Sequence, residues 1–251
     1  MKQLNLLLVT IFSFASQNQN YHFPKWKTTR TRKLLFTLAA LLALQFYATA
    51  QTRFTRSTFN AAFVPITLGG GATSSTAAGD NANQESIPLG FSFGYADSTF
   101  TSIGLSTNGF IWFDAVAPNV ATGNTNMVTT SSPNQCLGAW WNNLIDDASS
   151  DILYQTEGSP GTRKFTVQYT NYPTFTGTPG SNVRMNCQII LYETSNIIEF
   201  RYGSLNVIGA QTTSGGAMIG LEWGAGGSGK FIDAVTGSSI VSNRMLSPLG
   251  D

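Results

Sequence analysis

The sequence has few of the side chains that catalysis and metal binding use most. It contains one histidine, His22, and two cysteines, and charged residues make up only 11% of its 251 positions. Because no histidine follows residue 22, that part of the chain has no Ser-His-Asp or Cys-His catalytic site. It also has no histidine-ligated zinc and no histidine pH switch.

Long apolar runs are lacking as well. The apolar stretch at residues 34–47 is shorter than the roughly 20 residues that a membrane-spanning helix needs. A basic flank at residues 25–33 precedes it and Ala48-Thr49-Ala50 follows it, a combination typical of a cleaved secretory signal. We expect residues 1–50 to be removed and the chain to be exported to the periplasm, the cell surface or the extracellular space. An earlier apolar run at residues 4–13 leaves open a translation start near Lys25.

Basic residues are scarce once this leader is set aside. Six of the 14 lysines and arginines, and none of the 13 aspartates and glutamates, precede Gln51, so residues 51–251 carry a net charge of −5. Binding to nucleic acid or to an anionic membrane depends on clusters of lysine and arginine. We therefore expect neither partner, and no transmembrane segment after the leader.

Glycine and aromatic residues are plentiful, with 25 glycines and 12% aromatics. Apolar and polar residues alternate along residues 164–169, 183–191 and 198–202, which is the pattern of half-buried antiparallel strands. Turn residues separate roughly ten short strands of this kind, which predicts an all-β, antiparallel β-sandwich resembling a jelly-roll. About 200 residues suffice for one domain. Residues 51–86, with a Gly/Ser/Thr-rich loop, and residues 87–251 are expected to form it together.

Asn108-Gly109 predicts a β-hairpin, because this pair suits a two-residue type I′ turn. In that register Leu105 faces Trp112. One face of the hairpin then carries Ile103, Leu105, Phe110 and Trp112, and the other carries Ile111 and Phe113. Apolar residues on both faces predict a sheet that is covered on at least part of each side.

The order of several motifs is informative. Ser106-Thr-Asn-Gly-Phe-Ile-Trp-Phe113 is followed by Leu137-Gly-Ala-Trp-Trp141 and later by Asn196-Ile-Ile-Glu-Phe-Arg-Tyr-Gly203. Over residues 87–203 this series resembles the nidogen-like extracellular domain, and related β-sandwich modules in secreted and surface proteins of Bacteroidetes-type bacteria. The resemblance implies adhesion or matrix interaction and not catalysis.

Cys136 and Cys187 are the only cysteines. In an exported protein they suit a disulfide, which would stabilise the fold by roughly 3–4.7 kcal/mol for a loop of this length. Cys187 also lies among inward-facing apolar residues, where a free cysteine serves as a small core residue. Both alternatives stand at this point.

Asp146, Asp147 and Asp151 lie in an oxygen-rich segment with two asparagines. Because calcium takes about 6–8 oxygen ligands, these residues are candidates for a calcium site. Their spacing matches no EF-hand loop, and a solvated acidic turn is the favoured alternative. The same carboxylates are also considered as a glycoside hydrolase pair, but nothing in their spacing picks out an acid and a nucleophile. No other cofactor is expected.

Trp140 and Trp141 are adjacent, so in a strand they point to opposite faces. At least one of them lies outside the core of its sheet unless both faces are covered. An exposed tryptophan stacks on a sugar ring or a partner protein, whereas a buried one packs in the core. Trp140, Trp141 and Trp112 are therefore candidate ligand-binding residues, and Tyr172 is a weaker one.

Three functions are consistent with these observations. The first is a non-catalytic, secreted or cell-surface module that binds an extracellular protein or glycan in adhesion. The second is a carbohydrate-binding module that uses exposed tryptophans. The third, and least favoured, is a hydrolase that works with carboxylates alone.

Overall fold

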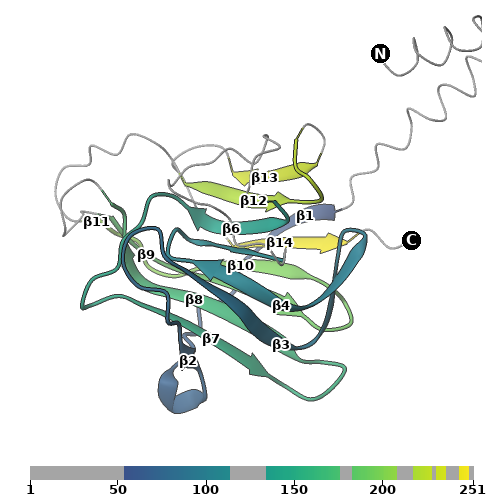
Figure 1. Cartoon of the computed structure of the whole chain (residues 1–251), viewed down its shortest axis with the longest axis horizontal. Helices are drawn as coiled ribbons and strands as arrows, with labels where there is room; N and C mark the ends of the chain where they lie inside the picture. Colours follow the sequence, from purple (N-terminus) through teal and green to yellow (C-terminus); the bar gives the residue numbers. More distant parts are fainter. Residues whose placement is uncertain are drawn as a thin grey trace, which may run out of the picture. The chain divides into compact units, whose positions relative to one another are not determined.

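The structure is a computed structural model that describes residues 54–113, 134–175, 183–207, 217–227, 230–235 and 243–248. The signal predicted at residues 1–50 lies outside these ranges. The described strands form two antiparallel sheets (Figure 1), and no α-helix occurs among the described residues. The predicted all-β sandwich is confirmed.

The larger sheet has eight strands and both edges are formed by N-terminal strands. Its order is β1 (Phe54–Phe59), β14 (Asn243–Pro248), β10 (Ile198–Tyr202), β9 (Val183–Tyr192), β8 (Lys164–Pro173), β7 (Asp151–Glu157) and β2 (Thr73–Ser74), and β11 (Asn206–Val207) also pairs with β9. Between β1 and β2 the chain forms one 3₁₀ turn, η1 (Leu68–Gly70). The chain therefore passes from one edge of this sheet to the other within about a dozen residues.

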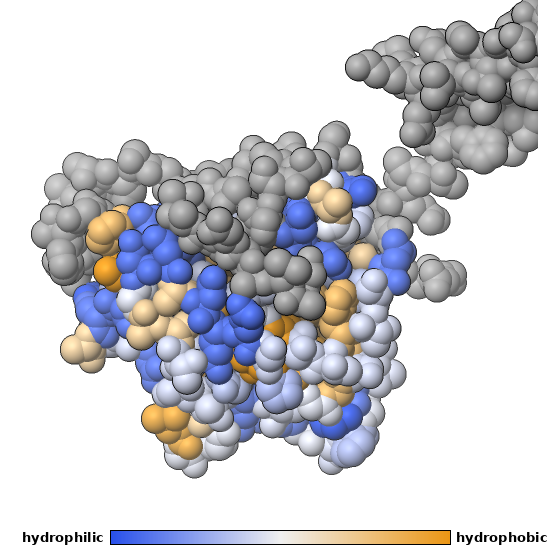
Figure 2. Space-filling model, viewed as in Figure 1, coloured by the Kyte–Doolittle hydropathy of each residue, from blue (hydrophilic) through white to orange (hydrophobic). Residues whose placement is uncertain are grey.

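The smaller sheet has six strands. Its order is β13 (Phe231–Val235), β12 (Met218–Glu222), β6 (Cys136–Trp141), β5 (Phe110–Trp112), β4 (Ser98–Ser106) and β3 (Asn83–Tyr95). Over the described part of the face in Figure 2, hydrophobic residues are scattered among hydrophilic ones.

The main core lies between the two sheets. On β8 the alternate residues Phe165, Val167 and Tyr169 are buried in it, as the sequence pattern predicts. They share the core with residues of the smaller sheet such as Leu89 and Leu137. The other face of each sheet, turned away from this core, is called its outer face below.

The hairpin that joins β4 and β5 differs from the prediction by one residue. Ser106 pairs with Phe110 and Leu105 pairs with Ile111, so the loop has three residues instead of two. Of the loop residues only Gly109 has a positive φ, of 81°, and its N–H donates to the carbonyl O of Ser106 at 3.3 Å. This matches the three-residue hairpin with glycine in the left-handed position.

The change of register exchanges the faces of β5. Ile111 and Phe113 join the main core, whereas Phe110 and Trp112 point to the outer face. The predicted pairing of Leu105 with Trp112 is therefore wrong, because a one-residue slip turns every side chain to the other face. The expectation that both faces are covered is confirmed, since Phe110 is 0% and Trp112 1% exposed.

Asn108 explains why the loop takes this form. Its side chain is fully buried, with Oδ1 accepting from the backbone N–H of Leu144 at 3.1 Å and Nδ2 donating to Oδ1 of Asn81 at 2.8 Å. A buried amide must have such partners. The turn thus joins the segments before β3 and after β6, and its Thr-Asn-Gly sequence serves the fold.

Candidate functional site

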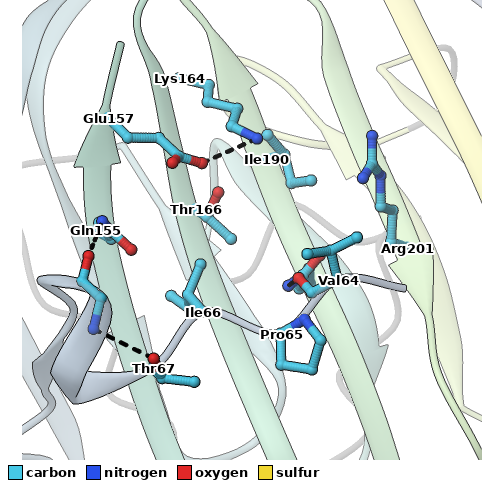
Figure 3. A pocket seen from close by; sticks show the side chains of 12 residues that line it. Val64, Pro65, Ile66, Thr67, Gln155, Glu157, Lys164, Thr166, Ile190 and Arg201 are labelled. Atoms are coloured by element: carbon cyan, nitrogen blue, oxygen red, sulfur yellow. Dashed lines mark hydrogen bonds and ion pairs between the residues drawn. The ribbon is translucent and has the colours of Figure 1, made fainter. Parts of the chain in front are cut away.

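After β1 the chain crosses the outer face of the eight-stranded sheet. We call residues 60–67 the strap (Figure 3). Pro65 lies at its centre and has no backbone N–H, so the strap is not suited to regular strand pairing. Side chains of the sheet bind its backbone instead, as the hydrogen bonds of two glutamines show.

Gln168 and Gln188 lie directly opposite each other on β8 and β9. Nε2 of Gln188 donates to the carbonyl O of Val64 and to Oε1 of Gln168, at 2.8 Å in both cases. Gln168 binds both backbone groups of Ile66: its Oε1 accepts from the N–H at 2.9 Å and its Nε2 donates to the C=O at 3.1 Å. Each glutamine is only 2% exposed.

These two glutamines act on the strap as a neighbouring strand would. A side-chain amide carries a C=O acceptor and an NH₂ donor, the same kinds of group that a peptide unit offers. A third glutamine, Gln155 on β7, donates from Nε2 to the carbonyl O of Gly70 at 2.8 Å, just beyond the strap. Three adjacent strands therefore contact the chain between Val64 and Gly70 through its backbone.

A hollow of about 220 Å³ opens between the strap and the sheet (Figure 3). Side chains from four neighbouring strands line its floor: Gln155, Glu157, Lys164, Thr166, Gln188, Ile190 and Arg201. Val64, Pro65 and Ile66 line its strap side. The floor is polar and hydrogen-bonding, with an apolar rim on one side only.

Both cations of this hollow are paired with carboxylates. Lys164 pairs with Glu157 at 2.9 Å, and both side chains are partly exposed. Arg201 pairs with Glu199, which is nearly buried and also accepts a hydrogen bond from the hydroxyl of Tyr192. The Glu199 carboxylate raises the pKa of Arg201, while burial and then Glu199 raise the pKa of Tyr192 to about 12. Each cation that lines the hollow therefore has a carboxylate partner, and the hollow presents charged and polar hydrogen-bonding groups that suit a polar ligand.

The predicted aromatic ligand residues are largely buried. Trp112 and Trp141 are each 1% exposed and pack with Phe110 and Cys136 on the outer face of the six-stranded sheet. Trp140 points to the opposite face, as its neighbour relation to Trp141 predicts, and stays partly exposed against the main core. Tyr172 is 1% exposed and packs edge-on against Tyr169. In this structure they form no flat exposed platform within the described residues.

The three aspartates of the predicted calcium segment have separate partners. Asp146 accepts from the N–H of Gly79 at 2.7 Å, and Asp151 accepts from the hydroxyl of Ser74 at 3.4 Å. Asp147 pairs with Arg184, and this contact holds the pKa of its carboxyl well below the usual range. Among the described residues no three His, Cys, Asp or Glu side chains are grouped so as to hold a metal ion. The calcium site stays a prediction from the sequence.

Cys136 and Cys187 are both buried and are not joined by a disulfide. Cys136 lies in the cluster on the outer face of the six-stranded sheet, whereas Cys187 lies in the main core. The disulfide considered from the sequence is not formed in this structure, because the side chain of Cys136 points away from the space between the sheets. Burial raises the pKa of both thiols.

Glu222 on β12 is a buried carboxyl that the sequence analysis did not single out. It is 1% exposed, and its Oε1 has no hydrogen-bond partner among the described residues. Burial raises its pKa to about 8, because a low-dielectric site disfavours the charged form.

The family model described as NIDO related matches residues 53–246. The chain belongs to this NIDO-related family. The nidogen-like domain expected from the motifs around residues 106–113 and 196–203 is thereby confirmed. None of the curated proteins and none of the solved structures compared with the chain matches it.

The match covers both sheets of the NIDO-related domain, including the strap and the two glutamines that bind it. Alternation in the sequence placed Gln168 and Gln188 on the polar side of their strands but could not show that this side is covered. The feature of the sequence that pointed to this site is that Gln168 and Gln188 both lie on the polar faces of their strands. In the part of the domain that the structure describes, no helix has the length and hydropathy to cross a membrane.

Proposed function

We propose that the NIDO-related domain is a non-catalytic binding module of adhesion type that acts outside the cytoplasm. The basic flank, apolar run and Ala48-Thr49-Ala50 of the leader support export, and nidogen-like domains are typically extracellular. The observation that carries the binding role is the hollow beside the strap, whose floor presents Lys164, Arg201 and the amide of Gln155. Its partner is a polar, acidic extracellular glycan or protein.

The contacts of the other candidate residues favour binding at the hollow over tryptophan stacking and over hydrolysis by carboxylates. Tryptophan stacking needs an exposed ring, yet Trp112 and Trp141 are 1% exposed. Hydrolysis by carboxylates needs two that share one cleft, yet Asp147 is held by Arg184 and Asp146 by the backbone of Gly79. The hollow, by contrast, presents several donors side by side.

Affinity electrophoresis of the full chain tests this proposal. Native gels would contain an acidic polysaccharide (pectate), a neutral one (dextran) or a protein (gelatin). We expect retardation by an acidic matrix, and we expect Lys164→Glu to abolish it because this change reverses a charge at the hollow. Lys230→Glu is the matched control, since Lys230 is an exposed lysine next to β13 of the other sheet. Free migration in all three gels, or equal effects of both variants, would overturn the proposal.

A further inference from the structure

The first described segment of the domain forms an arm that crosses the larger sheet. The arm comprises β1 and the strap, residues 54–67. Six residue pairs join β1 to β14, and β1 has no second neighbour among the described strands. Phe54, 3% exposed, packs against the rings of Tyr95 at 5.6 Å and Trp223 at 5.8 Å. The strap adds the hydrogen bonds to Gln168 and Gln188.

The arm is joined to the rest of the domain by a glycine-rich hinge, residues 68–71. Gly71 has a φ of 95°, a conformation that other residues rarely adopt, and a Cβ at Gly69 would meet no atom within 4 Å. Leu68 is 58% exposed, so little packing holds the hinge. Glycine reaches many backbone conformations at low cost. The hinge can therefore open without breaking a packed core around it.

We propose that two copies of this chain exchange their arms, each arm occupying the β14 edge, the Phe54 pocket and the Gln168–Gln188 amides of the other copy. A second copy offers every one of these contacts in the same form, so the exchanged dimer keeps all contacts of the arm and differs only at the hinge. Exchange of an identical element between protomers is a low-cost route to a symmetric dimer.

The partner is a second copy and not an arbitrary peptide, because the anchors differ in kind. The glutamines bind the backbone of Val64 and Ile66 and are tolerant of sequence. Phe54 instead fills a core position between Tyr95 and Trp223, and it lies ten residues before Val64. A segment must carry an aromatic anchor at this distance to satisfy both, and the arm itself does. This inference goes beyond the proposed function and does not depend on the acidic ligand.

Photocrosslinking between isotopically distinct copies tests the exchange. Full chains labelled with ¹⁴N and ¹⁵N, both carrying benzoylphenylalanine in place of the exposed Val64, are mixed, incubated and irradiated. Mass spectrometry then identifies crosslinks from residue 64 to peptides of residues 183–192. We expect mixed-isotope crosslinks in a dimer isolated by gel filtration. Crosslinks within one isotope only, whether the protein is monomeric or dimeric, would overturn the proposal.

Two variants distinguish the effect of the hinge from the effect of the hydrogen bonds that hold the arm. Deleting Gly69 and Gly70 shortens the hinge and is expected to raise the dimer fraction, since the arm then folds back on its own sheet only under strain.

Gln168→Ala combined with Gln188→Ala removes the same hydrogen bonds from the monomer and from the exchanged dimer. It is expected to speed exchange about tenfold, as the loss of about 1.4 kcal/mol of hydrogen bonding implies, and to leave the final dimer fraction unchanged. Lys164→Ala, on the same face of β8, is the control and should change neither. A hinge deletion that leaves the dimer fraction unchanged would contradict the mechanism.

Discussion

The indole of Trp112 occupies the space that a side chain at Gly104 would need. The two residues are register partners on β4 and β5, and a Cβ at position 104 would lie 2.0 Å from Cζ2 of Trp112. Only glycine leaves room for the ring to lie across the outer face of β4. This contact fixes the side of the hairpin on which Trp112 lies, and therefore the side on which Ile111 lies.

Gly104→Ala should destabilise the domain by about 3 kcal/mol, the upper end of the usual cost of overpacking. The measurement is urea denaturation followed by tryptophan fluorescence. Gly69→Ala is the control, since a Cβ there meets no neighbour. Because the clash is with one ring, Gly104→Ala combined with Trp112→Leu should cost less than the sum of the single changes. Additive losses would contradict the assignment.

Asn108→Ala should cost about 2–4 kcal/mol, because the change leaves the buried N–H of Leu144 without its acceptor and removes the bond to Asn81. The same urea titration measures it. Asn206→Ala, at an exposed position, is expected to stay within about 0.5 kcal/mol of the parent. A similar small effect for Asn108→Ala would mean that the turn is held by its backbone alone.

Glu222 should make the domain less stable as the pH rises from about 4.5 to about 8. In the unfolded chain this carboxyl ionises near 4.5, whereas burial raises its pKa in the folded state to about 8. Folding therefore favours the protonated form, and the stability present below pH 4.5 is lost progressively up to pH 8. Glu222→Gln should remove this loss and stabilise the domain by about 1–3 kcal/mol at pH 8.

Urea midpoints at pH 5, 6, 7 and 8 check the Glu222 prediction. The difference between Glu222→Gln and the parent should grow with pH, whereas Glu85→Gln, at an exposed position, should show no such trend. A difference that is the same at every pH would refute the titration of Glu222.

Neither cysteine should react with a thiol reagent in the folded protein. Cys136 and Cys187 are 0% exposed, and burial raises the pKa of each thiol, which lowers the fraction of reactive thiolate. Iodoacetamide treatment under native conditions should leave the mass unchanged, and treatment in urea without reductant should add two groups. Failure to label in urea would reveal a disulfide.

Much of the fold follows from the sequence because its signal is local. The alternation of Phe165, Val167 and Tyr169 with polar residues specifies a face, and the structure places that face in the core. The predicted pairing of the hairpin strands is wrong by one residue, because the Asn108 side chain accepts a hydrogen bond from the N–H of Leu144, 36 positions away. Turn propensities describe neighbouring residues and do not include such a long-range contact.

The candidate site was harder to predict, since it depends on what covers a polar face. Residues 60–67 have no clear periodicity, and Gln168 and Gln188 look like ordinary surface residues. They become a site only because the strap crosses them, which reflects the sheet order and not the local sequence. The sequence could not show which tryptophan is exposed, for the same reason. Alternation places Trp140 and Trp141 on opposite faces of β6, but it does not reveal that Trp141 is buried on the outer face.

The pairing of β1 with β14 also sets how the domain responds to mechanical tension. Phe54 is the register partner of Pro248, so the first and last described residues of the domain lie beside each other. A force that pulls these ends apart acts along the hydrogen bonds between two antiparallel strands, which are perpendicular to the strand axes, and breaks them one after another. The arm would peel away in sequence, first β1 and then the strap from Gln188 and Gln168. Under load between its ends, this module would lengthen at low force instead of resisting as a rigid link.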